Sequence, residues 1–181
     1  MPTMLLPDET YLDWVLEDRR ERGIDAHNEV WGGVYVVMPI ANNEHQIIGG
    51  RLSLAYGFVT DFDHGDRCLP GANVSDREGD WTKNYRVPDL AVEVLSSNDR
   101  SRDKLDFHAS VGTRELVVLD RDPWRIEVYR LLDGRLCSAE TAAAVGESVR
   151  TTTVPAAWHL LSLDGSPHVD VETGGRRTAL D

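Results

Sequence analysis

The chain has 181 residues, of which 41% are hydrophobic and 28% charged, and this composition is typical of one soluble globular domain with its own core. The formal net charge of −12 argues against a broad basic surface for nucleic acid, while a locally basic cleft stays compatible with it. Two isolated cysteines, no leader-like N-terminus and no membrane-length apolar run indicate a cytoplasmic protein without a disulfide framework, a zinc site or a membrane span.

Two helices separated by a hairpin are predicted for the first part of the chain. Residues 8–22 place apolar side chains at helical spacing, and Gly23 would end this helix. Residues 29–38 predict two short strands around a Gly32-Gly33 turn. Residues 42–61 predict a long helix with a broad apolar surface, in which Gly49-Gly50 suggests close approach of a neighbour.

The next stretch is mainly polar. Residues 67–74 predict an interrupted strand, and residues 75–84 predict a polar loop with three acids, of which Asp76 is one. Solvation explains these acids adequately. Asp76 is nevertheless a candidate third carboxylate for a site on the strand that follows.

The strand predicted over Pro88–Leu95 carries two acids on one face. Because side chains alternate along a strand, Asp89 and Glu93 point the same way as Ala91. A strand with one face in water would explain this pattern. The alternative is a divalent-metal site, since carboxylates are rarely buried unless they are paired or bound to metal, and acidic oxygens suit Mg²⁺.

A short helix is predicted over residues 99–110, with Gly112 ending it. It would lie near the carboxyl end of the preceding strand and so bring Lys104 towards Glu93. The basic residues of this helix, Arg100, Arg102 and Lys104, have two interpretations. They either pair with acids of their own helix, or Lys104 faces Glu93 while the arginines lie near phosphates.

Strands dominate the prediction that follows. Residues 115–120 and 125–131 predict two strands, and the continuous apolar run of the first is typical of a central buried strand. Residues 136–154 predict two more short strands around Gly146.

The C-terminal part is predicted to be irregular. Residues 154–163 predict a short turn or 3₁₀ segment in which Trp158 and Leu160 serve as anchors. From Asp164 onwards the chain is rich in Gly, Asp and Arg, which favours a flexible tail over residues 164–181. We therefore expect one domain over residues 1–163.

Four ordered pieces of this sequence, Val87–Val92, Val92–Ser97, Asp99–Leu105 and Gly112–Asp120, resemble the Uma-type putative restriction endonucleases of the PD-(D/E)XK nuclease superfamily. The resemblance implies an α/β fold, with a restriction-endonuclease-like mixed β-sheet flanked by helices. It also implies Mg²⁺-dependent (or Mn²⁺-dependent) hydrolysis of DNA phosphodiester bonds by an endonuclease that is often a homodimer.

The resemblance also implies roles for particular residues. Asp89 and Glu93 match the acids that bind the metal, and Lys104 matches the lysine that assists the attacking water. Glu29 matches an acid that precedes the family's first hairpin and is a candidate extra ligand, although a solvated acid at a strand end explains it equally well. His45 lies where a polar residue of the family's helix can face the site, although a capping or surface role is the commoner one.

One departure from the family pattern affects the expected chemistry. Family members usually show two Pro-Asp strands, whereas this chain shows one, so that Asp89 and Glu93 lie on the same strand. Four residues of extended chain separate their Cα atoms by about 13 Å, which makes a shared metal ion marginal. The alternative is therefore a nuclease-fold protein that has lost catalysis and acts as a homo-oligomeric binding or regulatory module. A metal-free acid-base enzyme is a third hypothesis, with no specific support in the sequence.

Overall fold

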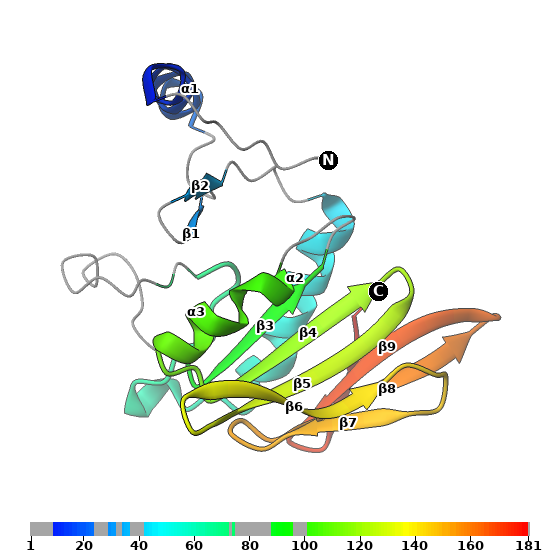
Figure 1. Cartoon of the computed structure of the whole chain (residues 1–181). Helices are drawn as coiled ribbons and strands as arrows, with labels where there is room; N and C mark the ends of the chain where they lie inside the picture. The colour runs from blue at the N-terminus through cyan, green and yellow to red at the C-terminus, as the bar shows by residue number, and fades with distance from the viewer. Residues whose placement is uncertain are drawn as a thin grey trace. The chain divides into compact units, whose positions relative to one another are not determined.

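The structure is a computed structural model (Figure 1) that describes residues 9–23, 29–31, 34–36, 42–72, 74, 88–95 and 101–180. The chain divides into two compact units, Met1–Asn42 and Asn43–Asp181. The expected single domain over residues 1–163 stays a prediction. Among the described residues, no helix is both long enough and apolar enough to cross a bilayer.

The first unit contains the predicted helix and hairpin. Helix α1 spans Glu9–Glu21, and Gly23 follows it with a φ of 65°, the left-handed conformation that glycine tolerates at the end of a helix. Strands β1 (Glu29–Trp31) and β2 (Val34–Val36) are antiparallel. Trp31 lies opposite Val34, so two residues connect the strands, as the sequence predicted.

A mixed four-stranded sheet forms the centre of the second unit, in the order β3-β4-β5-β6. Its strands span β3 Leu90–Val94, β4 Glu115–Arg121, β5 Trp124–Leu132 and β6 Arg135–Ala142. Strand β3 runs parallel to β4, and the remaining pairs are antiparallel. Leu116, Val117, Val118 and Leu119 have no exposed surface, which confirms β4 as the buried central strand.

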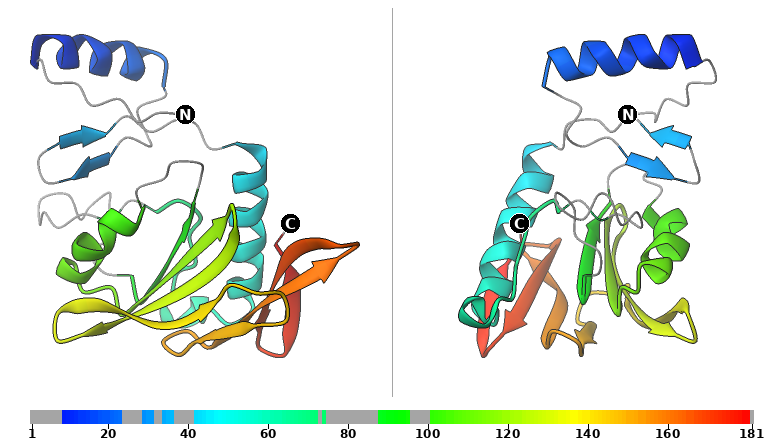
Figure 2. Two further views of the ribbon diagram at one scale, coloured as in Figure 1. Left: turned by 45° about the vertical axis from the view of Figure 1, so that its right-hand side comes forward. Right: turned by 90° about the vertical axis from the view of Figure 1, so that its left-hand side faces the viewer.

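Helices cover both faces of this sheet (Figure 2). Helix α2 (Asn43–Gly57) packs Ile48 and Leu52 into a cluster that contains Val117 and Leu119. The 3₁₀ helix η3 (Ser101–Lys104) continues into α3 (Leu105–Ser110), whose Leu105 packs on the face with Leu116 and Val118. Alternation along β4 thus supplies one apolar face to each helical layer.

A second, antiparallel sheet, in the order β10-β9-β8-β7, corrects the prediction for the C-terminal part. Its strands span β7 Ser148–Thr151, β8 Ala156–Leu163, β9 Ser166–Thr173 and β10 Arg176–Ala179. The predicted turn over residues 154–163 is wrong, although its anchors Trp158 and Leu160 are indeed buried. The predicted irregular segment from Asp164 onwards is also wrong, because β9 and β10 bury Val169, Val171 and Leu180 completely.

Three smaller expectations also differ from the structure. Helix α2 ends at Gly57 rather than at residue 61, because Val59 N–H bonds back to Tyr56 O and the short 3₁₀ helix η1 (Phe62–His64) follows. A Cβ placed at Gly49 or Gly50 would meet no atom of the described residues within 4 Å, so no close neighbour in that part of the chain explains this pair. Residues 67–72 form no strand, while residues 75–84 lie outside the described part of the chain.

Glu115 joins the two sheets at the start of β4. Its carboxylate accepts hydrogen bonds from Arg130 Nε at 2.9 Å and from the backbone N–H of Thr152 at 2.8 Å and of Thr153. Burial alone would raise the pKa of this carboxyl, but the donors from Thr153, Arg130 and Thr152 hold the pKa of Glu115 below its ordinary value. The side chain is therefore an ionised link between β4 and the turn that follows β7.

Candidate active site

Glu93 lies on the face of β3 that α3 covers. Strand alternation confirms the predicted separation of faces, because Leu90, Val92 and Val94 pack with the cluster under α2, while Ala91 packs with the opposite cluster. In the register of the sheet, Glu93 lies beside Val118 of β4. Its side chain is 24% exposed, so the carboxylate lies at the edge of a packed layer.

The helical segment after β3 brings a lysine to this carboxylate. Lys104 ends η3, and its Nζ lies 3.6 Å from Glu93 Oε2. Lys104 is only 9% exposed, and an ammonium group at this depth needs an opposite charge nearby. The structure thus brings Glu93 and Lys104 together, as the helix prediction implied.

His108 is a third member of this cluster, and the sequence analysis missed it. Its Nε2 lies 3.2 Å from Glu93 Oε1, and its Nδ1 lies 3.4 Å from Thr113 Oγ1. The ring is 4% exposed, and Thr113 has no exposed surface. The available signal was the spacing of Lys104 and His108, since residues four apart lie on one face of a helix.

Arg102 pairs with acids of the sheet rather than with acids of its own helix. Its guanidinium lies 2.6 Å from Glu127 Oε2 and 3.1 Å from Asp120 Oδ2. Glu127 and Glu93 both align with Val118 in the register, so the two acids lie on the same face of the sheet. Arg102 and Lys104, two basic residues of this helical segment, therefore each pair with a carboxylate from the strands.

Asp89 has different surroundings from Glu93. It lies in a bend just before β3, and its side chain is 67% exposed. Arg114 Nη1 lies 3.4 Å from its Oδ1, and this arginine is itself 66% exposed. The structure therefore places one predicted metal ligand in a surface ion pair and the other in the cluster with Lys104 and His108.

The three additional candidates stay predictions. Glu29 is the first residue of β1 in the other unit. His45 lies in the first turn of α2 and is partly buried. Asp76 lies outside the described residues.

The described residues do not form a complete metal site. They contain no group of three His, Cys, Asp or Glu side chains that could hold a metal ion. Glu93 with Lys104 fits the acid and lysine of a metal-dependent hydrolytic centre. Mg²⁺ takes several oxygen ligands, so a second carboxylate would have to join Glu93 to complete such a centre.

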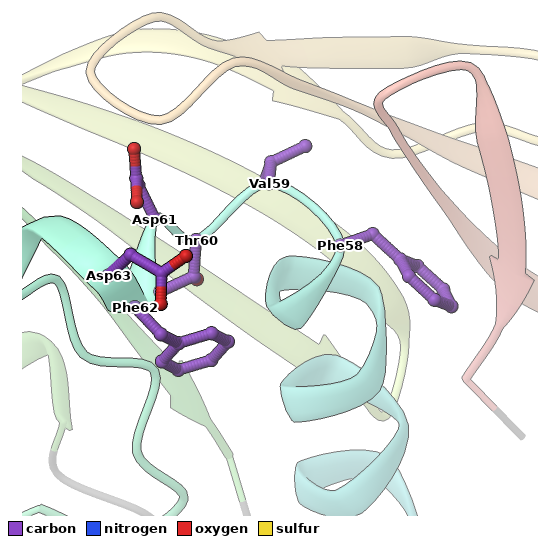
Figure 3. Close-up of a pocket in the computed structure, with 6 residues that line it drawn as sticks. All are labelled: Phe58, Val59, Thr60, Asp61, Phe62 and Asp63. Atoms are coloured by element: carbon purple, nitrogen blue, oxygen red, sulfur yellow. The ribbon is translucent and has the colours of Figure 1, made fainter.

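A shallow hollow of about 370 Å³ lies at the end of α2 and contains none of the predicted site residues (Figure 3). Residues 58–63 line it, and Phe58 and Phe62 project from separate points of this turn. The hollow offers two carboxylates, Asp61 and Asp63, and no cation among its lining residues. It is therefore a weaker candidate for chemistry than the cluster at Glu93.

Comparisons with known proteins agree with this fold. The model of the Uma2 family, described as a putative restriction endonuclease, matches residues 68–164. The crystal structure of a putative nuclease belonging to DUF820 from Anabaena variabilis ATCC 29413 superposes with a TM-score of 0.51 and 15% sequence identity. That superposition covers 70% of this chain and 82% of the other, and it confirms the nuclease-type mixed α/β fold. A comparison with curated proteins found no match.

Proposed function

The chain belongs to the Uma2 family of putative restriction endonucleases, and from this premise we propose that it hydrolyses phosphodiester bonds of DNA with the help of a divalent metal ion. The observation that carries the proposal is the 3.6 Å contact between Glu93 and Lys104. A carboxylate on the strand beside the central strand and a buried lysine on the following helix are two of the groups that such a reaction requires in one place.

The roles that we propose follow from the chemistry of each group. Glu93 and Asp89 would hold Mg²⁺ or Mn²⁺, which for Asp89 requires exchange of its exposed partner Arg114 for the metal. A bound divalent ion would supply an activated water and neutralise charge on the phosphate. The ammonium group of Lys104 would orient that water or stabilise charge on a phosphate oxygen, because it is held at a fixed point by burial.

The wider assignments belong to the same proposal. We propose DNA as the substrate, a homodimer as the working form and the cytoplasm as the location. Support for self-association comes from two apolar side chains exposed on one stripe of α2, Ile47 at 51% and Leu54 at 56%, and from Phe58 at 45% in the turn that follows the helix.

A second candidate function is a nuclease-fold protein that has lost catalysis and acts as a homo-oligomeric binding or regulatory module. The observation that favours it is the arrangement of the two acids. Both oxygens of Glu93 already have partners in Lys104 and His108, and Asp89 pairs with Arg114. The net charge of −12 also weakens non-specific attraction to DNA.

Metal titration separates the two candidates. We would titrate Mg²⁺ and Mn²⁺ into the wild type, Asp89→Asn and Glu93→Gln by calorimetry, with cleavage of supercoiled plasmid measured beside it. Asp106→Asn is the matched control, because Asp106 is exposed on α3. Saturable binding that both site variants lose, together with metal-dependent nicking, is the result expected for the enzyme. A folded wild type that binds no metal and leaves the plasmid intact would instead support the catalytically impaired module.

A further inference from the structure

We propose that His108 is a positioning residue, which holds Oε1 of Glu93 through its Nε2–H and so presents Oε2 on the side of Lys104. This inference rests on the proposed function in one respect, namely that Glu93 is the carboxylate that binds the metal. It adds a residue that the acid-lysine pattern does not contain.

The geometry supplies each contact that this role needs. Lys104 Nζ and His108 Nε2 approach different oxygens of the same carboxylate, Oε2 at 3.6 Å and Oε1 at 3.2 Å. A carboxylate gripped at one oxygen by a buried ring has little freedom to rotate about its last torsion angle. The second oxygen is then directed consistently, which is what a metal ligand requires.

The tautomer of His108 follows from its two neighbours. Glu93 Oε1 can only accept a hydrogen bond when the carboxyl is ionised, so the proton of a neutral ring must be on Nε2. Nδ1 is then an acceptor, and the hydroxyl of Thr113, at 3.4 Å, is the donor that suits it. The opposite tautomer would set the unprotonated Nε2 against a carboxylate oxygen, which is electrostatically unfavourable.

Burial makes this arrangement specific. His108 is 4% exposed and Thr113 is fully buried, so each needs a partner within the protein. Glu93 does not need His108 for charge compensation, because Lys104 already supplies an opposite charge. The contact with the ring therefore fixes the direction of the carboxylate rather than its charge.

The affinity for a metal ion and the protonated nitrogen of the His108 ring together test the proposal. Calorimetric titration of Mn²⁺ would be made on the wild type, His108→Phe, His108→Gln and Thr113→Val. Partners of this kind change metal affinity by roughly 10-fold to 100-fold when they are removed, so we expect His108→Phe to weaken binding by about 10-fold. His108→Gln keeps an N–H donor and should restore most of the affinity, which a purely structural role of the ring would not predict. His64→Phe is the matched control, because His64 is an exposed histidine paired with Asp61.

Nuclear magnetic resonance of the wild type provides a second reading that requires no substitution. Long-range ¹H–¹⁵N correlations should show His108 protonated at Nε2 and unprotonated at Nδ1. A ring protonated at Nδ1 and not at Nε2 overturns the inference, and so does unchanged Mn²⁺ affinity in folded His108→Phe when the wild type binds Mn²⁺. A wild type that binds no metal overturns the proposed function, and with it the role of His108 in positioning a metal ligand. In that protein, a ring protonated at Nε2 would still be the tautomer that the contact between His108 and Glu93 requires.

Discussion

Two substitutions of the same chemistry test the part of the fold that the sequence misassigned. Leu180 follows β10 and has no exposed surface, while Leu163 ends β8 and is 60% exposed. The backbone N–H of Leu180 also donates to Val169 O at 2.9 Å, which ties the end of the chain to β9. We predict that Leu180→Ala destabilises the protein strongly and that Leu163→Ala does not.

The magnitude follows from burial. Removing a fully buried leucine side chain costs about 3 kcal/mol, the sum of its lost transfer free energy and the cavity that remains. For a chain of this length, that change lowers Tm by about 9 °C. Leu163→Ala should alter the free energy of unfolding by less than about 0.5 kcal/mol, because its side chain is mostly in water already.

Urea unfolding followed by tryptophan fluorescence measures both variants, since Trp158 lies in the same buried cluster as Leu180. The slope of the free energy against urea should stay unchanged if both variants unfold in one step. Equal, small effects from Leu180→Ala and Leu163→Ala would refute the reasoning. The segment after Leu163 would then be a tail that contributes nothing to the core.

Three further predictions concern ionisation and assembly. Glu115→Gln should cost about 3 kcal/mol near neutral pH. Because the pKa of Glu115 is lowered in the folded protein, the ionised carboxylate stabilises the fold at pH values above its ordinary pKa of 4.5, and this stabilisation is lost as the pH falls through the lowered pKa. The loss of unfolding free energy in Glu115→Gln should therefore shrink as the pH falls. A loss that does not change with pH in an acid denaturation series would contradict this link. Burial raises the pKa of Tyr56 to about 12, so spectrophotometric titration should show a phenol step near that pH that Tyr56→Phe removes; a titration in which Tyr56→Phe removes no late step argues against its burial. Leu54→Glu should convert a sedimenting dimer to a monomer, whereas a dimer that survives it excludes the stripe on α2 as the interface.

The pair at the candidate site could be predicted from the sequence because it depends on local rules. Alternation along β3 places Glu93 on one face, and the helix that follows a parallel strand returns over that face. Lys104 is therefore near Glu93 for reasons that a short stretch of chain contains. His108 lies one helical turn further and obeys the same spacing, but only the fold shows that Thr113 and Glu93 lie at its two nitrogens.

Tertiary contacts decided what local rules could not. Arg102 has acids nearby in its own helix, yet its partners are Asp120 and Glu127, which lie on the neighbouring strands β4 and β5. Asp89 shares a strand face with Glu93 in the sequence pattern, but it lies in a bend before β3, where Arg114 is available. Packing decides which residues of distant segments form ion pairs, and a sequence pattern does not show how far apart those residues lie in the folded chain.

The sequence by itself determined the central strands, the buried β4 among them, and the pair of Glu93 and Lys104, because side-chain periodicity specifies such elements locally. The mixed arrangement of the sheet followed from the resemblance to a known family. Only the tertiary structure decided that the polar, glycine-rich end of the chain forms β9 and β10. In sequence, strands with one polar face resemble an irregular segment. They become strands because neighbouring strands supply hydrogen-bond partners and an apolar layer covers their other face. Val169 and Val171 are buried because β8 and α2 lie beside them, and this is a property of the fold rather than of the segment.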